Sequence, residues 1–295
     1  MKLLHYVASS YEFGSFGGVA RFDNELKKAI GIKTFLPRQR SELLDELSPD
    51  SIVITDNGKC MDIPDCYKCI VVHHGIARIH KRREPAWNGS QYLTGQEKMS
   101  NRKNTYFISP SSFVQRHVKI EHGIDSELIL HSVDLEKQIK PRRTSLKPVV
   151  IGDWRGYNKG EMVARKLMAS DKYEFKFLKC GNDKESKQAA YAEADIYLAL
   201  SLCEGNSYSA LDALACGIPV LSTDVGLFGG DCPTGVCGEI IDWKERNNTV
   251  LIEEKLDYMM NNIEKYTPSA WVSSTNSFEK WCKRWREYVM KINFI

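Results

Sequence analysis

Two carboxylates near residue 210 lie in a sequence that favours a turn followed by a helix. Glu204 is followed by Gly205, Asn206 and Ser207, and Asp212 comes eight positions after Glu204. Small polar residues of this kind are typical of a helix N-cap, and a helix N-terminus binds phosphate groups through its free amides and its dipole. If Glu204 caps the helix, both carboxylates lie on one helical face, where they can accept hydrogen bonds from sugar and ribose hydroxyls.

Two cations follow an apolar run earlier in the chain. The run is Val149–Gly152, and Arg155 and Lys159 come shortly after it. Fixed cations beside a helix dipole can neutralise the charge that grows on a departing diphosphate, without a metal ion. Taken alone, an Arg and a Lys at this spacing are equally typical of a solvated surface.

The segment from Glu204 to Asp212 resembles the donor-binding signature of retaining glycosyltransferases of the family-4 type, or glycosyl transferases group 1, which have the GT-B fold. The resemblance implies that Glu204 contacts the transferred sugar and that Asp212, where the family has Glu, binds the nucleotide ribose. It implies that Arg155 and Lys159 hold the leaving diphosphate. The other donor-binding residues that it implies in this segment are Gly205, Asn206, Ser207 and Tyr208.

Weaker similarities to this family occur in the first half of the chain. Gly17 and Gly18 resemble the glycine loop that faces the donor phosphates. His73 and His74 end an apolar run, where the family often has a histidine that faces the reacting sugar; a buried structural histidine is the alternative. Cys66 and Cys69 are spaced as zinc ligands, but no second ligand pair follows, so we expect no metal site and no metal cofactor.

Apolar runs typical of strands alternate with helical stretches along both halves of the chain. This pattern predicts an α/β protein with two Rossmann-like, doubly wound domains, and the family resemblance adds a GT-B arrangement in which the domains face a central cleft. The expected strands are 3–8, 51–55, 69–73, 105–109, 128–131, 149–152, 174–180, 196–199 and 220–222, and the clearest expected helices are 19–30 and 211–215.

The boundary between the domains is expected at residues 138–148, which hold two prolines and several cations. This gives an acceptor-side domain over 1–137 and a donor-binding domain over 149–276. Residues 277–295 form an expected helix with an aromatic stripe, which the resemblance implies crosses back to pack on the first domain. The stripe consists of Phe278, Trp281, Trp285, Tyr288 and Val289.

Composition indicates a cytoplasmic protein with an anionic partner. The nine cysteines are an odd number scattered through apolar runs, as in proteins with reduced thiols, and the first ten residues do not resemble a signal peptide. Residues 70–147 hold 14 Lys and Arg against 7 Asp and Glu. Within them, the stretch 77–104 is basic, contains Trp87 and Tyr92, and is expected to be an irregular loop. An anionic membrane surface or a nucleic acid is its expected partner.

The expected activity is transfer of a sugar from a nucleoside diphosphate sugar to an acceptor hydroxyl with retention of configuration. The acceptor favoured by the resemblance is a glycan or a lipid-linked saccharide. A hydroxymethylated DNA base is an alternative acceptor because of the basic stretch 77–104. A protein that binds nucleotides or sugars without transfer, and a sugar-nucleotide epimerase, are further alternatives. The sequence leaves the oligomeric state open.

Overall fold

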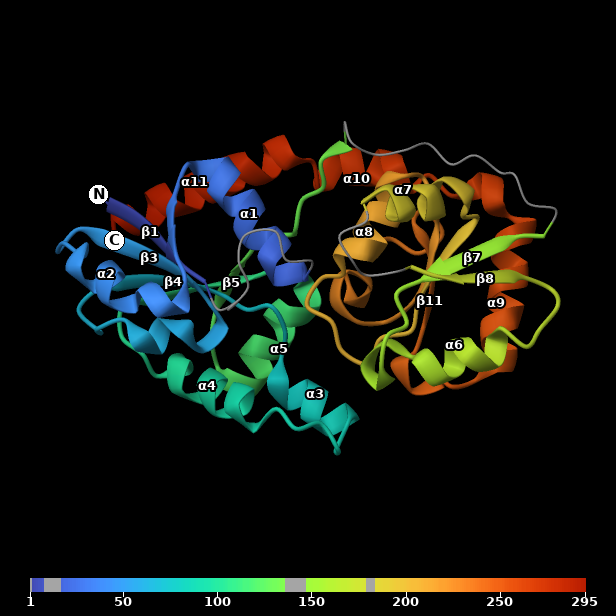
Figure 1. Ribbon diagram of the computed structural model, residues 1–295, viewed down its shortest axis with the longest axis horizontal. Coiled ribbons are helices and arrows are strands. Elements are labelled where there is room, and N and C mark those ends of the chain that lie inside the picture. The colour runs from blue at the N-terminus through green and yellow to red at the C-terminus, as the bar shows by residue number, and fades with distance from the viewer. Residues whose placement is uncertain (1, 8–16, 136–146, 179–183) are drawn as a thin grey trace. The chain divides into compact units, whose positions relative to one another are not determined.

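The structure is a computed structural model that describes residues 2–7, 17–135, 147–178 and 184–295 (Figure 1). The chain forms two compact units, residues 1–131 with 279–295 and residues 132–278. Each unit has one parallel sheet with helices packed around it, which is the α/β, Rossmann-like architecture expected from the sequence. Most of the expected linker, residues 138–148, lies outside the described residues.

The first unit is built around the sheet that contains the N-terminal strand. Its strands are β1 Lys2–Tyr6, β2 Lys33–Phe35, β3 Ser51–Asp56, β4 Lys68–Val72, β5 Thr105–Ser109 and β6 Ser126–Leu128. They lie in the order β2-β1-β3-β4-β5-β6. The chain order therefore reverses at β1, with β2 on one side and β3 on the other. Such a reversal opens a crevice outside the carboxyl ends of the strands, where α/β proteins commonly bind ligands.

The helices of the first unit are α1 Gly18–Ile30, α2 Arg40–Asp45, α3 Ala77–Arg83, α4 Ser90–Ser100, α5 Ser112–His122 and α11 Phe278–Asn293, with 3₁₀ helices η1 Pro37–Gln39 and η2 Asn57–Asp62. The C-terminal helix α11 packs on α1. The rings of Trp281 and Trp285 each lie 5.9 Å from the ring of Phe22, and Arg286 donates a hydrogen bond to the Ala29 carbonyl at 2.7 Å. Burial of the aromatic stripe thus joins the two ends of the chain in one unit.

The stretch 77–104 is helical, so the expectation of an irregular loop is wrong. It forms α3 and α4 instead. The buried Gln96 side chain accepts a hydrogen bond from the Ala77 amide at 2.9 Å and donates one to the Gly75 carbonyl at 2.7 Å. A satisfied polar side chain therefore fixes α4 against the start of α3. An apolar stripe, which the sequence lacks here, is not needed for that contact.

Several cations of these helices are neutralised within the unit. Arg78 pairs with Glu97 and Arg82 with Glu121, both at 2.9 Å. The aromatic rings of this region also contact one another, since the His80 and Trp87 rings stack with their centroids 4.3 Å apart. Two of the cations of this region therefore have acidic partners within the unit.

The second unit is built around a sheet whose strands lie in the order β11-β10-β9-β7-β8. Its strands are β7 Val149–Gly152, β8 Glu174–Phe177, β9 Ile196–Ala199, β10 Val220–Thr223 and β11 Gly238–Ile241. Its helices are α6 Glu161–Leu167, α7 Lys184–Glu193, α8 Tyr208–Ala215, α9 Thr249–Asn261 and α10 Pro268–Thr275, with 3₁₀ helices η4 Tyr157–Lys159, η5 Gly226–Gly229, η6 Trp243–Glu245 and η7 Ile263–Lys265.

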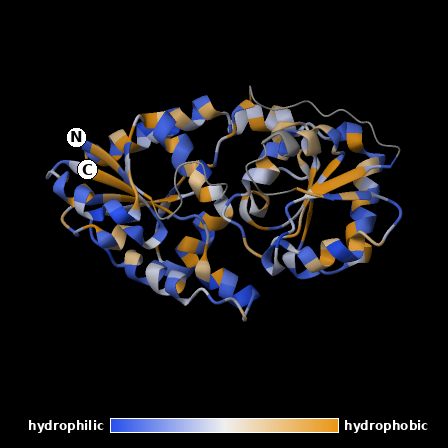
Figure 2. Ribbon diagram, viewed as in Figure 1, coloured by the Kyte–Doolittle hydropathy of each residue, from blue (hydrophilic) through white to orange (hydrophobic). Residues whose placement is uncertain are grey.

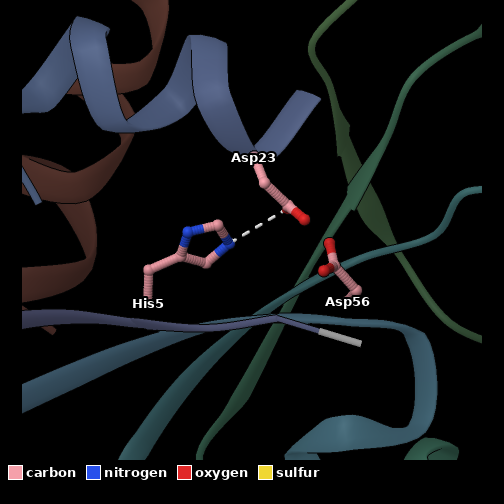
Figure 3. A group of neighbouring side chains, drawn as sticks. All are labelled: His5, Asp23 and Asp56. Carbon is pink, nitrogen blue, oxygen red and sulfur yellow. Dashed lines mark ion pairs between the residues drawn. The ribbon is translucent and has the colours of Figure 1, made fainter. Parts of the chain in front are cut away.

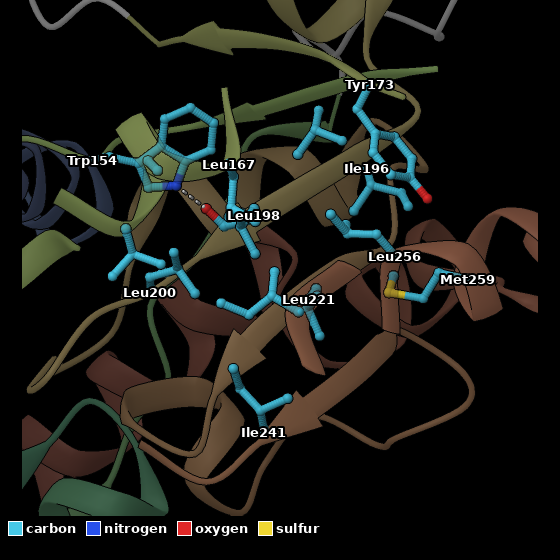
Figure 4. Close-up of a cluster of buried hydrophobic side chains, with 14 of the residues drawn as sticks. Trp154, Leu167, Tyr173, Ile196, Leu198, Leu200, Leu221, Ile241, Leu256 and Met259 are labelled. Carbon is cyan, nitrogen blue, oxygen red and sulfur yellow. Dashed lines mark hydrogen bonds between the residues drawn. The ribbon is translucent and has the colours of Figure 1, made fainter. Parts of the chain in front are cut away.

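The core of the second unit lies between the sheet and α6 and α9 (Figure 4). Trp154, Leu198 and Leu221 are completely buried there. The indole Nε1 of Trp154 donates a hydrogen bond to the Leu198 carbonyl at 2.9 Å, which satisfies the polar atom of a buried ring. This contact fixes the chain just after β7, three residues before the start of η4.

The strands of both sheets are formed by apolar segments of the sequence. Figure 2 shows apolar strands inside each unit and helices that carry apolar and polar residues on different faces. No helix of the described residues is long and apolar enough to cross a membrane.

Two edge strands, β2 and β11, were not expected from the sequence. β2 has only three residues, and β11 begins with Gly238, which weakens the strand pattern. Gly238 has φ of 143°, and a Cβ there would lie 1.9 Å from the Val220 carbonyl oxygen. Close contact between two backbones therefore requires glycine at this position. The strand expected at 128–131 ends earlier, as β6.

Candidate functional site

The loop between β9 and α8 contains the predicted signature. The N-cap of α8 is Ser207, whose hydroxyl accepts a hydrogen bond from the Ala210 amide at 3.4 Å. Glu204 lies three residues before this cap. The expectation that Glu204 caps the helix is therefore wrong, and Glu204 lies outside the helix whose face carries Asp212. Asp212 lies on α8 and is half-buried, and the N-terminus of α8 has the dipole that attracts anions.

Glu204 is held by two side chains. Its Oε1 forms an ion pair with Lys159 Nζ and accepts a hydrogen bond from Ser201 Oγ at 2.8 Å. Burial lowers the pKa of Lys159, but the charge and the hydrogen bond of Glu204 raise it by more, so the net pKa lies above 10.5. Lys159 is therefore charged at neutral pH, and a fixed cation stands beside the signature carboxylate.

The segment that carries Lys159 is hydrogen-bonded to the segment that precedes Glu204. The Cys203 amide donates to Asn158 Oδ1 at 3.2 Å, and Asn158 Nδ2 donates to the Cys203 carbonyl at 3.3 Å. The Leu202 amide also donates to the Asn158 carbonyl at 2.8 Å. These three bonds fix the backbone on which the ion pair is built.

Gly226 makes a close contact with the same loop from a third segment. Its φ is 55°, and a Cβ at this position would lie 3.0 Å from Glu204 Cβ and 3.2 Å from the Gly205 carbonyl oxygen. A side chain here would strain the backbone and displace Glu204. Gly226 therefore belongs to the structural support of the site.

Arg246 is a supporting residue that the sequence did not reveal. It is only 2% exposed, and its Nη1 donates to the carbonyls of Tyr157, Asn158 and Leu200 at 3.1, 3.2 and 3.1 Å. Its guanidinium also lies 4.8 Å from the centre of the Tyr157 ring. One cation thus joins η4 to the end of β9. Arg246 lies between a strand and a helix and belongs to no recognisable motif, so the sequence did not indicate its supporting role.

The remaining predicted residues of the second unit have different environments. Arg155 forms a bidentate pair with Asp153 at 2.6 and 3.0 Å, and its side chain is 55% exposed. Gly205, Asn206 and Tyr208 are buried next to Glu204 in the chain. The structure therefore brings Lys159 to Glu204 directly, and it keeps Arg155 at the surface with a carboxylate of its own.

Gly17, Gly18, His73 and His74 belong to the first unit. Gly17 is the N-cap of α1, and a Cβ on it would meet nothing within 4 Å, so packing does not require glycine there. His74 Nε2 lies 2.7 Å from Asp56 Oδ1, and the ring packs edge-on against Phe22 at 5.0 Å.

His73 differs from His74 because it is completely buried. Its ring packs at 5.5 Å from Phe107, and neither ring nitrogen has a hydrogen-bond partner among the described residues. Burial, with smaller contributions from His122 and His74, lowers the pKa of His73 to about 3. A neutral, buried ring of this kind is typical of a structural histidine.

This low pKa predicts acid sensitivity. The unfolded chain binds a proton at His73 below about pH 6.5, whereas the folded chain resists it until about pH 3. Stability must therefore fall as the pH drops through this window, by about 2–3 kcal/mol from this residue between pH 7 and 4.5. Urea unfolding of wild type and His73→Leu at both pH values measures the effect. An unchanged pH dependence in the variant would contradict it.

Residues 124–267 match the model of the family described as glycosyl transferases group 1. The chain carries a group 1 glycosyltransferase domain. This domain includes Lys159, Glu204, Asp212 and Arg246. None of the curated proteins matches the sequence significantly.

Solved structures show that the chain has the GT-B fold. Sucrose-phosphate synthase from Thermosynechococcus elongatus matches with a TM-score of 0.78 and 10% identity, over 99% of both chains. Anabaena Alr3699/HepE in complex with UDP and glucose matches with a TM-score of 0.74 and 13% identity, over 99% of this chain and 100% of that one. The lipopolysaccharide outer core galactosyltransferase WaaB matches with a TM-score of 0.67 and 15% identity, over 99% of both. The group 1 domain is thus part of a protein with two Rossmann-like units.

Proposed function

We propose that this group 1 glycosyltransferase transfers a sugar from a nucleoside diphosphate sugar to an acceptor hydroxyl with retention of configuration. The observation that supports this most directly is the ion pair of Lys159 with Glu204, in the loop that leads into α8. A cation, a sugar-binding carboxylate and a helix dipole are the groups needed where a glycosidic bond to a diphosphate breaks.

Each group has a defined role in the proposed reaction. Lys159 and the N-terminus of α8 stabilise the negative charge that develops on the leaving diphosphate, and Arg155 adds a second cation. Glu204 accepts hydrogen bonds from the transferred sugar, and Asp212 accepts them from the ribose. This charge stabilisation requires no metal ion.

A uridine diphosphate sugar is the proposed donor class. HepE was solved in complexes with UDP and with UDP-glucose, and its fold is shared by this chain. A glycan or lipid-linked saccharide is the proposed acceptor. The pairing of Arg78 and Arg82 with glutamates reduces the cationic surface that a DNA acceptor would require.

A panel of nucleoside diphosphate sugars tests the donor assignment. Bound donor raises the melting temperature by mass action, so we expect a uridine diphosphate sugar to give the largest shift. Incubation with acceptor saccharides should then release the nucleoside diphosphate, and NMR of the product should show the donor's anomeric configuration. Consumption of donor without acceptor would indicate an epimerase, and an inverted product would exclude the proposed mechanism.

Asp212→Asn tests the proposed ribose contact. The change keeps the size of the side chain but replaces one accepting oxygen by a donor, so we expect the donor Kd to rise about 10-fold, as for the loss of a hydrogen bond to a charged group. Titration calorimetry with the donor found in the panel measures this. Asp171→Asn, at an exposed position of the same unit, is the matched control. An unchanged Kd for Asp212→Asn would remove Asp212 from the donor site.

A further inference from the structure

Three side chains converge in the interior of the first unit at the point where the strand order reverses. His5 comes from β1, Asp23 from α1 and Asp56 from the end of β3, and Figure 3 shows the imidazole directed toward the two carboxylates. All three are buried, with exposed fractions of 0%, 3% and 0%. One ligating atom from each lies within 4.8 Å of the others.

The polar atoms of this cluster are poorly satisfied by the protein. His5 Nε2 lies 3.4 Å from Asp23 Oδ1, which is long for a charge-assisted hydrogen bond. Within the described parts of the chain, both ring nitrogens of His5 and Oδ1 of Asp23 lack a hydrogen bond of normal geometry. Leaving such buried groups unsatisfied costs about 1–3 kcal/mol each, so a further ligand at this place is favoured.

The spacing and the chemistry of the three groups fit a metal ion. In a tetrahedral site with bonds of about 2.0–2.1 Å, neighbouring ligand atoms lie roughly 3.3–3.4 Å apart, close to the separation of His5 and Asp23. One imidazole nitrogen with two carboxylate oxygens suits zinc or manganese, whereas Mg²⁺ prefers oxygen ligands and retains water. A divalent cation also offsets the repulsion between two buried carboxylates.

The surroundings of Asp56 have the form of an outer coordination shell. His74 Nε2 lies 2.7 Å from Asp56 Oδ1 and orients this carboxylate. Hydrogen bonds of this kind fix ligating groups in metal sites and strengthen the binding of the ion. The three residues also lie at the strand reversal, where the carboxyl ends of the adjacent strands β1 and β3 border the crevice of the sheet.

We propose that His5, Asp23 and Asp56 bind one divalent transition-metal ion of the zinc or manganese class, with His74 as the outer-shell partner of Asp56. The ion joins α1 to the strands β1 and β3 and stabilises the first unit. It takes no part in the charge stabilisation proposed for Lys159 and Glu204, so the two proposals stand or fall separately.

Metal analysis of the full-length protein tests the site. The chain is unfolded in the presence of a chelator and refolded with Zn²⁺, Mn²⁺ or Mg²⁺. Gel filtration then removes the excess ion. We expect one retained equivalent of Zn²⁺ or Mn²⁺ and none of Mg²⁺. Asp23→Asn should weaken binding by about 100-fold or more, because even outer-shell changes cost 10- to 100-fold. Asp125→Asn, at an exposed position of the same unit, should bind as the wild type does.

Cobalt substitution of the wild type keeps the test valid if Asp23→Asn does not fold. Co²⁺ bound by His5, Asp23 and Asp56 has a spectrum of nitrogen and oxygen ligands only. A thiolate charge-transfer band would instead place the ion on a cysteine such as the exposed Cys66, and would overturn the proposal. Refolded protein without stoichiometric metal would overturn it as well.

Discussion

Glu204→Gln is expected to lower turnover by about 100-fold or more while the protein remains folded. The amide keeps the shape of the side chain but loses the negative charge that pairs with Lys159. In the proposed reaction, this charge also strengthens the hydrogen bonds that Glu204 accepts from the sugar. Removal of one preorganised group that acts on developing charge typically costs 10²–10³-fold in kcat, which is about 3–4 kcal/mol of transition-state stabilisation. Steady-state kinetics with the donor and acceptor identified by the panel measures the loss.

Lys159→Met should have an effect of similar size, for the complementary reason. In the proposed reaction the leaving diphosphate loses the cation that Lys159 supplies, and Glu204 is left half-buried without its counter-charge. Because the two residues act as one unit, we expect the double variant to lose little more than the worse single variant. Glu254→Gln, at an exposed position of α9, is the control and should leave kcat unchanged. Near-normal turnover of both single variants would remove this pair from the active site.

Arg246→Met is expected to lower the free energy of unfolding by about 3 kcal/mol or more. Methionine retains much of the apolar volume, but the carbonyls of Tyr157, Asn158 and Leu200 lose a charged donor in the interior. Each such bond contributes about 1.5–3 kcal/mol, and buried acceptors without a donor add a penalty. The urea-unfolding transition of the second unit measures this loss of unfolding free energy.

The same variant should reduce turnover, because η4 carries Lys159 and is held by Arg246. Arg246→Lys keeps the charge but lacks the planar fork that reaches several carbonyls, so we expect only partial recovery of stability and activity. Arg165→Met is a suitable control, since Arg165 is 64% exposed and pairs with Glu161 on the same helix. Wild-type stability of Arg246→Met would show that solvent or neighbouring groups replace its hydrogen bonds.

The sequence predicted those features that depend on local patterns. Strands such as Ser51–Asp56 and Val220–Thr223 are buried along their whole length. Such strands are recognisable in the sequence because they form short, nearly continuous apolar runs. The run from Glu204 to Ser207 was recognised as a turn and helix start because small polar residues there have a specific hydrogen-bonding role, although the cap itself is Ser207 and not Glu204. The fold class follows from the alternation of such elements.

Features that depend on contacts between distant segments could not be predicted. Nothing near Arg246 indicates that it reaches carbonyls some 45 and 90 residues away in the chain. Glu204 was placed at a helix cap because an acid near a helix start usually interacts with the dipole, whereas its partner is Lys159. The helices of 77–104 were missed because Gln96 replaces apolar packing with hydrogen bonds.

The interlocking of the segments around Asn158, Cys203 and Arg246 limits how the enzyme can be re-engineered. At the proposed donor site, a new donor preference cannot be introduced by exchanging residues 201–212 alone, because Asn158 and Gly226, from two other parts of the chain, contact the backbone of this loop. A transplanted loop must bring along residues equivalent to 157–160, Gly226 and Arg246. The proposed donor site can therefore be exchanged between proteins only together with the rest of the second unit.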